Sequence, residues 1–222
     1  MTLAIVVPVK SPKRAKQRLD SVMSEPERSR LATAMARDVF AVVAKFDEAA
    51  RFVVSDDPDV LAEGRQFGLE PVEDRAGQGQ SAAVGQGFTL AWERGFPVAL
   101  TIPGDVPGIT ISELRRFSDY RREIEVLLAP DRGRIGTNGL RLAPPHAISL
   151  AFGEDSFNLH RAAAARANRS FAVLEVEGLR YDLDTPDDVV AFIRLGRETA
   201  TLELLRELNV LDRVLAATPP HA

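Results

Sequence analysis

Cysteine is absent from this chain of 222 residues, and this absence excludes disulfide bonds, thiolate metal sites and cysteine nucleophiles. It also favours an intracellular protein. No apolar run approaches the roughly 18 residues of a membrane span, and no basic leader precedes Leu3, so we expect a cytoplasmic protein with no membrane partner. The formal net charge of -4 speaks against sequence-independent binding to nucleic acid, so no such partner is expected.

Lysine is also scarce, and its distribution is uneven. Three of the four lysines, at positions 10, 13 and 16, fall within seven residues, next to Arg14 and Arg18. A solvated charge run is the simplest reading of this basic loop. The alternative is a binding site for an anionic ligand, and the position of the loop after an apolar segment favours it.

The composition is otherwise that of an ordinary folded protein, with 45% hydrophobic and 27% charged residues. A chain of this length buries roughly 70% of the surface that its unfolded form exposes, which is enough for a core without metals or crosslinks. No internal repeat and no linker divide the sequence. We therefore expect a single domain over residues 1–222.

Short apolar segments alternate with helical patterns along the chain. Strand patterns cover residues 3–9, 52–55, 69–72, 97–102, 125–129, 140–142, 171–176 and 180–183, and helical patterns cover 24–46, 58–67, 81–94, 112–122, 155–167, a segment from 185 and 198–217. This alternation predicts a Rossmann-like α/β fold with a mixed, mostly parallel sheet flanked by helices. The later, closely spaced strands predict its antiparallel part.

Two helix starts are well marked. Ser24 and Glu27 have the spacing of a capping box, and Thr185 precedes a helix-opening proline and an acidic first turn at Asp188. The last helix, about 198–217, has an apolar leucine and valine set. It either caps the core or joins a homodimer.

Three polar elements follow predicted strands: the basic loop 10–18, Gly104-Asp105, and Asp182-Leu183-Asp184. Ligands of doubly wound sheets bind beyond the carboxyl ends of the strands, so these elements can meet at one edge. On an extended backbone Asp182 and Asp184 face the same side. Carboxylates beside a cationic loop suit Mg²⁺ and a substrate phosphate. The alternatives are a turn-stabilising Asp105 and a helix-starting Asp184.

Other signatures are weak. The sequence has no Walker-type phosphate loop, and the glycine pattern at Gly77, Gly79 and Ala82 follows a polar loop instead of the first strand. The turn before the helix at Ser81 still suits a nucleotide, because backbone N–H groups at a helix start bind phosphates or base edges. His160 is either a satisfied helix histidine or a contact to an anionic substrate.

Five segments together resemble the 2-phospho-L-lactate guanylyltransferase family, which makes a precursor of coenzyme F(420) and has a nucleotidyltransferase fold of the GT-A type. They are VPVK with the spaced Lys16 and Arg18, PGDVP at 103–107, PDRGRIGTNGL at 130–140, FGEDSFNLH at 152–160 and DLDTPDD at 182–188. The likeness covers nearly the whole chain. The chain departs from many relatives at Gln80-Ser81, where they have Leu-Asn near the nucleotide base.

The resemblance implies GTP, Mg²⁺ and a phosphorylated three-carbon acid as ligands. It implies the following roles: Lys16 and Asp105 are catalytic; Asp105, Asp182 and Asp184 bind the metal; Thr137, Gly153 and Ser156 bind the acceptor acid; Lys10, Lys16 and Arg18 lie along the triphosphate; Gly79 and Ser81 lie near the nucleotide. The acceptor phosphate would attack the α-phosphorus of GTP and release pyrophosphate. Because a phosphate nucleophile is already ionised at neutral pH, no general base is needed.

Several alternatives stay open at this point. The acceptor is 2-phospho-L-lactate, phosphoenolpyruvate or 3-phospho-D-glycerate, which small differences in a pocket distinguish only by ~1 to 3 kcal/mol. Another nucleotidyltransferase, such as a molybdenum cofactor guanylyl- or cytidylyltransferase, would share the fold and Lys16. A scaffold protein that uses the last helix to bind a partner is the alternative outside enzymes.

Overall fold

A seven-stranded mixed sheet forms the centre of the structure, a computed structural model that describes residues 3–75 and 77–217. Its strands are β1 (Leu3–Pro8), β2 (Ala49–Ser55), β3 (Glu70–Glu73), β4 (Val98–Thr101), β5 (Val126–Pro130), β6 (Thr137–Leu142) and β7 (Phe171–Val173). Their order across the sheet is β3-β2-β1-β4-β6-β5-β7. Only the pairs of β6 with β4 and β5 are antiparallel among the described strands, so the predicted mixed, mostly parallel sheet is confirmed.

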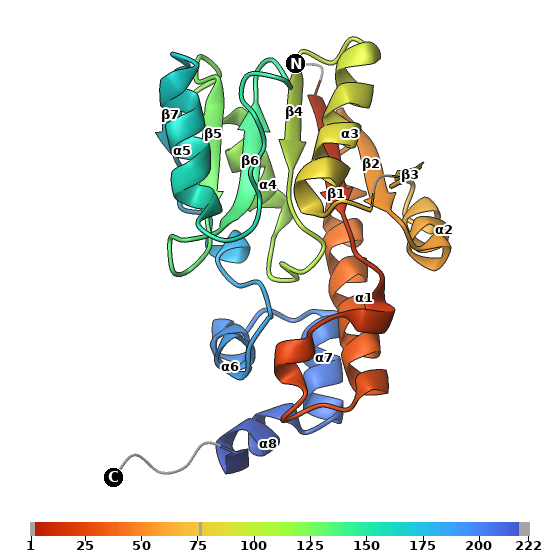
Figure 1. Ribbon diagram of the computed structural model, residues 1–222. Coiled ribbons are helices and arrows are strands. Elements are labelled where there is room, and N and C mark those ends of the chain that lie inside the picture. The colour runs from red at the N-terminus through yellow and green to blue at the C-terminus, as the bar shows by residue number, and fades with distance from the viewer. Residues whose placement is uncertain (1–2, 76, 218–222) are drawn as a thin grey trace.

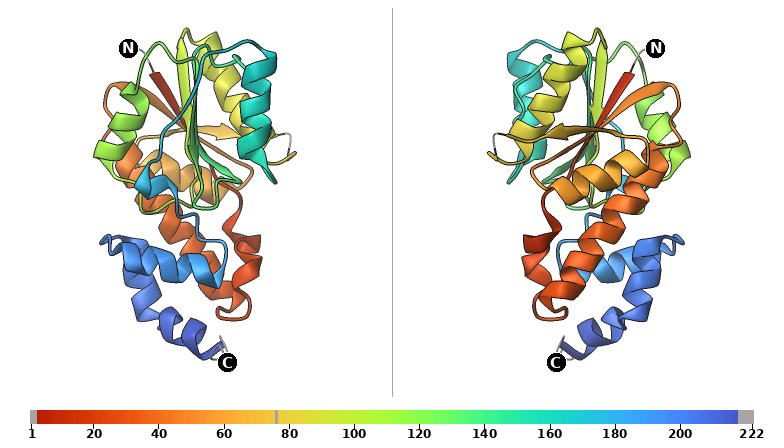
Figure 2. Two further views of the ribbon diagram at one scale, coloured as in Figure 1. Left: turned by 90° about the vertical axis from the view of Figure 1, so that its left-hand side faces the viewer. Right: turned by 90° about the vertical axis from the view of Figure 1, so that its right-hand side faces the viewer.

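Helices cover both faces of the sheet (Figures 1 and 2). One face carries α1 (Glu25–Val43), α2 (Pro58–Gln66) and α4 (Ile111–Asp119), and the other carries α3 (Gln80–Glu93) and α5 (Ser156–Arg166). Strand β1 shows why its sequence is apolar at every position: Ile5 and Val7 enter one core, and Ala4 and Val6 enter the other. A strand between two helical layers must be apolar on both sides.

A third hydrophobic core lies beyond the carboxyl end of β1. It joins the first half of α1 to α6 (Pro186–Leu195), α7 (Ala200–Glu207) and α8 (Val210–Ala217), through residues such as Leu31, Phe192 and Leu202. Figure 1 shows these three helices below the sheet. Of the two alternatives for the last helical segment, α7 follows the first, because it packs on α1 and covers the third core.

The prediction of one continuous helix over 198–217 is wrong. The chain forms two helices, and the break between them lies at Asn209, whose φ is 51°. A left-handed backbone cannot continue a right-handed helix, and asparagine adopts it more readily than most residues with a side chain. The break lets Val210 and Val214 of α8 turn toward the third core, where both are buried.

The predicted strand over 180–183 is also wrong. After β7 the chain forms a short 3-10 helix (Glu177–Leu179) and then an irregular segment along the carboxyl edge of the sheet. The backbone of this segment forms hydrogen bonds with two loops and not with a strand. The Arg132 N–H donates to the Arg180 carbonyl at 3.0 Å, and the Leu183 N–H donates to the Asp105 carbonyl at 3.4 Å. Leu183 is fully buried, as a residue of a central strand would be, but its side chain packs in the third core and not in the sheet.

Both predicted helix starts are present, and each forms a capping box. The Ser24 N–H donates to the Glu27 carboxylate at 2.8 Å, and the Thr185 N–H donates to the Asp188 carboxylate at 2.9 Å. The second box fixes where α6 begins, directly after Asp184. Within the described part of the chain, no helix is both long and apolar enough to cross a membrane.

Candidate active site

The carboxyl ends of β1 and β4 lie side by side, because these strands are parallel neighbours. Strand β6 runs antiparallel to β4, so it begins at the same edge. The edge therefore collects the segment after β1, the segment after β4 and the first residues of β6. It is also the point where the chain order reverses, with β2 on one side of β1 and β4 on the other, which is where ligands of open α/β sheets bind.

The Lys16 side chain lies between two carboxylates at this edge. Its Nζ is 2.7 Å from Asp105 Oδ2 and 2.6 Å from Asp184 Oδ1, and the side chain is 7% exposed. Lys16 has a left-handed backbone, with φ 56° and ψ 41°, between the two short 3-10 helices of the basic loop. Burial opposes the charged ammonium, but Asp105 and Asp184 outweigh burial and raise the pKa of Lys16 above its ordinary value. Lys16 is therefore a fixed cation.

Asp182, the third aspartate at this edge, accepts a hydrogen bond from a side-chain amide. The Asn138 Nδ2 donates to Asp182 Oδ1 at 3.0 Å and to the Leu179 carbonyl at 2.8 Å. Burial, and next the negative charge of Asp105, raise the pKa of Asp182 to about 6. Both burial and the neighbouring carboxylates therefore disfavour the ionised form of Asp182, and a cation beside it would favour that form.

Asp184 differs from Asp182 because positive charge surrounds it. Burial would raise the pKa of Asp184, but Lys16, with smaller contributions from Arg18 and Lys10, lowers it below its ordinary value. Both of these smaller contributors are exposed. The structure thus brings the predicted basic loop and all three predicted aspartates to one edge.

The donor set suits a hard divalent cation, since all three candidate ligands are carboxylates. The described residues contain no ready-made cluster of three or more His, Asp or Glu side chains around a single ion position. In this arrangement the Lys16 ammonium bonds Asp105 and Asp184. The residues therefore fit Mg²⁺ in chemistry and charge, provided that Lys16 leaves these carboxylates.

Three further predicted residues lie near His160: in β6, in the loop before α5 and at the start of α5. Thr137 Oγ1 lies 3.1 Å from His160 Nδ1. Ser156 opens α5, is 2% exposed and lies one helical turn before His160. Gly153 is exposed, and its φ of 121° is a conformation that residues with a side chain rarely adopt. The Ser156 N–H also donates to the Gly153 carbonyl at 3.2 Å, so the structure brings the predicted acceptor residues close together around the start of α5.

The predicted nucleotide residues lie at the start of α3. Gly79 caps this helix with a φ of 90°, and Ser81 accepts a hydrogen bond from the Phe152 N–H at 2.8 Å. In this structure the Ser81 hydroxyl therefore serves the loop that leads to Gly153. The first turn of α3 stands next to the acceptor loop.

Sequence reasoning missed Asn138 and left His160 undecided. Both are polar and buried, with exposures of 7% and 0%. The available signal was the position of Asn138, a polar residue next to Thr137 in a strand that is buried throughout. Buried polar groups require hydrogen-bond partners. The partner of Asn138 lies 44 residues away, so only the tertiary structure identifies it.

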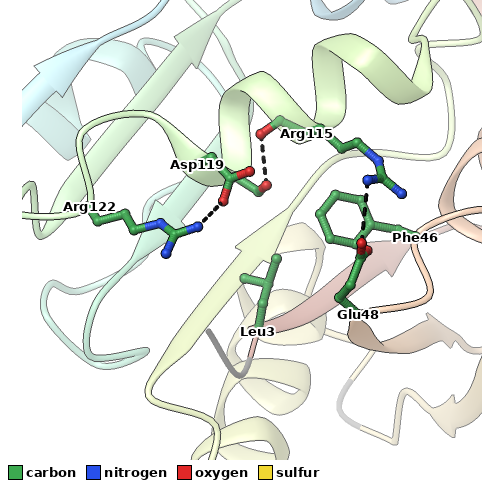
Figure 3. A pocket seen from close by; sticks show the side chains of 7 residues that line it. Leu3, Phe46, Glu48, Arg115, Asp119 and Arg122 are labelled. Atoms are coloured by element: carbon green, nitrogen blue, oxygen red, sulfur yellow. Dashed lines mark hydrogen bonds and ion pairs between the residues drawn. The ribbon is translucent and has the colours of Figure 1, made fainter.

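A well-formed hollow lies at the opposite edge of the sheet (Figure 3). It has a volume of about 150 Å³ and lies near Leu3, at the amino end of β1. Ion pairs at its rim join Arg115 to Glu48 at 3.3 Å and Arg122 to Asp119 at 2.8 Å. None of the predicted site residues lines it, so it is not part of the candidate active site.

The chain is similar to known proteins over most of its length. The family model described as "Guanylyl transferase CofC like" matches residues 3–216. A phosphoenolpyruvate guanylyltransferase of Rubrobacter xylanophilus is 35% identical over 85% of this chain and 92% of its own length. A 2-phospho-L-lactate guanylyltransferase of Methanothermobacter thermautotrophicus is 32% identical over 94% of this chain and 92% of its own length.

A solved structure shares the fold. The putative nucleotide-diphospho-sugar transferase of Desulfovibrio desulfuricans G20 superposes with a TM-score of 0.80 at 16% identity, covering 96% of this chain and 97% of its own. At this identity the likeness concerns the fold alone. It confirms the predicted GT-A-like nucleotidyltransferase architecture.

Proposed function

Since the chain belongs to the CofC-like guanylyl transferase family, we propose that it transfers GMP from GTP to the phosphate of a three-carbon phospho-acid, with release of pyrophosphate, in coenzyme F(420) biosynthesis. The observation that supports this best is the meeting of Lys16 with Asp105 and Asp184 beside the Thr137 pocket. The relatives' names favour phosphoenolpyruvate or 2-phospho-L-lactate as acceptor. A molybdenum cofactor nucleotidyltransferase is not favoured, because the family match covers residues 3–216.

The three aspartates are proposed to hold Mg²⁺ with the triphosphate. A magnesium ion bound there would neutralise charge that builds up on the α-phosphate and the departing pyrophosphate. Burial, and next the charge of Asp105, raise the pKa of Asp182, and this supports the role because an adjacent cation would stabilise the ionised carboxylate. Asn138 keeps the Asp182 carboxylate at this edge while it does so.

Lys16 is proposed to move from the carboxylates to the phosphates when GTP arrives. Its raised pKa makes it an ammonium while it contacts the two carboxylates, and phosphate oxygens would stabilise the same charge afterwards, so it contributes positive charge and transfers no proton. Lys10 and Arg18 are exposed beside Asp184 and would meet the outer phosphates. The loop thus neutralises a leaving group that carries several negative charges.

The pocket of Thr137, Gly153 and Ser156 is proposed to hold the acceptor acid. Hydroxyl and backbone donors there would fix the carboxylate, which leaves the acid's phosphate free to face the α-phosphorus. A phosphate oxygen then forms the new bond to phosphorus, and the bond to the pyrophosphate oxygen breaks. Because that phosphate is already ionised, catalysis depends on alignment and charge neutralisation.

A pyrophosphate-release assay tests this function. Purified protein is mixed with GTP, Mg²⁺ and, separately, phosphoenolpyruvate, 2-phospho-L-lactate and 3-phospho-D-glycerate, and the nucleotide-linked product is identified by mass. We expect turnover with at least one acid and none without added acid. CTP in place of GTP tests the base preference, and the absence of a guanylylated product with all three acids would overturn the proposal.

Cytoplasmic location and a homodimer stay predictions from the sequence. In the described chain α8 leaves Leu215 59% exposed, and this side chain would be covered if α8 joined two copies. Light scattering tests the homodimer, because a mass of one chain, 24.2 kDa, would contradict it.

A further inference from the structure

The imidazole of His160 is fully buried and makes two hydrogen bonds to different parts of the candidate acceptor pocket. Nδ1 lies 3.1 Å from Thr137 Oγ1, and Nε2 lies 3.0 Å from the backbone nitrogen of Ala151. Thr137 begins β6, Ala151 lies in the loop before α5, and His160 lies on α5 itself. One side chain therefore connects three segments of the pocket.

The partner of Nε2 fixes the tautomer of this ring. A backbone N–H can only donate, so Nε2 accepts the hydrogen bond from Ala151 and carries no proton. Burial lowers the pKa of His160 to about 4, so the ring is neutral at physiological pH. The single ring proton is therefore on Nδ1, and it is donated to the Thr137 hydroxyl oxygen.

This direction of donation determines what the Thr137 hydroxyl does. Its oxygen accepts from the imidazole, so its own proton points to another group. Among the residues that the structure describes, His160 is the one hydrogen-bond partner of Thr137 Oγ1. The hydroxyl is thus left as a donor, which is the role that an anionic ligand requires.

The second hydrogen bond of the imidazole fixes the loop opposite Thr137. The Ala151 N–H bonds Nε2, the next N–H, of Phe152, bonds Ser81 Oγ at 2.8 Å, and the Phe152 ring packs edge-on against the imidazole with centroids 4.8 Å apart. These contacts immobilise the residues directly before Gly153. The loop and the hydroxyl therefore share one rigid support.

We propose that His160 is a positioning residue for the acceptor acid: the neutral imidazole makes Thr137 a hydrogen-bond donor and holds the 151–153 loop against it. This inference rests on the proposed function, since it takes the ligand to be the phospho-acid. His160 itself does not touch the acid and transfers no proton. Its effect is on the affinity and alignment of the acceptor and is absent from the binding of GTP.

Two substitutions separate the two hydrogen bonds. His160→Asn keeps an N–H near the position of Nδ1 but loses the acceptor for Ala151, whereas His160→Gln places a carbonyl near Nε2 and loses the donor to Thr137. We expect His160→Gln to raise the KM for the acid at least roughly tenfold, with the KM for GTP changed less than about twofold. His160→Asn should retain much of the acceptor affinity that His160→Gln loses, because it keeps the donor to Thr137.

A double-mutant cycle tests whether His160 acts through Thr137. In a Thr137→Val background, which has no hydroxyl to orient, His160→Gln should change the acceptor KM by less than about threefold. If the two substitutions raised the acceptor KM independently, so that their fold-changes multiplied in the double variant, the proposal would be overturned. Equal changes in the KM for GTP and for the acid would also overturn it. Thermal unfolding of each variant identifies any that fail to fold, and the His160→Asn comparison is then made between folded proteins.

A measurement without turnover keeps this proposal separate from the proposed function. Nitrogen-15 NMR of the histidine side chains in the ligand-free protein is expected to show His160 as the neutral tautomer protonated at Nδ1. A proton on Nε2 would overturn the inference whatever the enzyme catalyses. Absence of turnover by the wild-type protein with every acid would instead contradict the proposed function.

Discussion

Replacing Lys16 by methionine removes the ammonium from between Asp105 and Asp184 and keeps most of its apolar stem. Removing one partner of a fully buried ion pair destabilises a protein by about 3–5 kcal/mol. Here the two carboxylates are 33% and 44% exposed, so water screens part of the uncompensated charge. We therefore expect Lys16→Met to destabilise the metal-free protein by about 1–3 kcal/mol, which lowers the melting temperature by about 2–12 °C.

The pH dependence of this loss follows from Asp184. Burial would raise the pKa of Asp184, but Lys16 outweighs burial and lowers the pKa in the folded protein. The ionised Asp184 therefore stabilises the fold above its unfolded pKa, and this stability is lost as the pH falls through the folded pKa. The variant loses much of this contribution. The stability difference between wild type and Lys16→Met should therefore be largest near neutral pH and shrink below about pH 4.

Magnesium provides the decisive comparison. If the metal and the ammonium compete for the same carboxylates, Mg²⁺ should raise the melting temperature of Lys16→Met more than that of the wild type, while turnover of the variant is lost. Calorimetric unfolding with and without Mg²⁺ measures this. Equal responses of the two proteins to Mg²⁺ would refute the reasoning, because the ion would then bind elsewhere.

Lys13→Met is the matched control for this experiment. Lys13 lies in the same basic loop, is 71% exposed, and pairs loosely with Asp57 and Asp59 at 3.8 and 3.7 Å. Exposed pairs of this kind contribute about 0–1 kcal/mol. The control should therefore leave both the melting temperature and its response to Mg²⁺ nearly unchanged.

Three further substitutions give separate tests. Asp182→Asn should raise the melting temperature at pH 7 by the equivalent of ~1–3 kcal/mol while turnover falls, because the raised pKa of Asp182 means that its ionisation weakens the fold as the pH climbs from about 4 to about 6; a lower melting temperature at pH 7 would contradict this. Asp105→Asn should lower turnover at least ~100-fold with an unchanged circular dichroism spectrum, and normal activity would remove Asp105 from the metal site. Asn209→Ala should destabilise the protein by about 1 kcal/mol and Asn209→Gly should not, because φ at this position is 51°; equal melting temperatures for the two variants would show that the helix break is not strained.

Local sequence was sufficient wherever neighbouring residues decide the structure. The apolar run at the start of the chain predicted a strand buried on both faces, and Ser24 with Glu27 predicted where α1 begins. These features depend on hydrogen bonds and side-chain contacts over a few positions, so the pattern of residue types contains the necessary information.

The two wrong elements show where such reasoning stops. Leu183 has the burial of a strand residue, but it packs into the third core, and its backbone N–H pairs with Asp105. Asn209 sits inside an apolar helical pattern, and the backbone turns there so that Val214 reaches the same core. In both places long-range packing overrides the local periodicity. An apolar residue in the sequence looks the same whether it is buried in a sheet or against helices.

The pattern of residue types was sufficient to predict the fold class, the chemical types of the site residues and, through the motifs, the family resemblance. Which of these groups touch follows from the folded chain alone. Lys16 meets Asp105 and Asp184 across 89 and 168 positions, and His160 meets Thr137 across 23. Hydrogen bonds, burial and repulsion act through space, so the raised pKa values of Lys16 and Asp182 and the single tautomer of His160 arise only once the sheet has brought their partners to one edge.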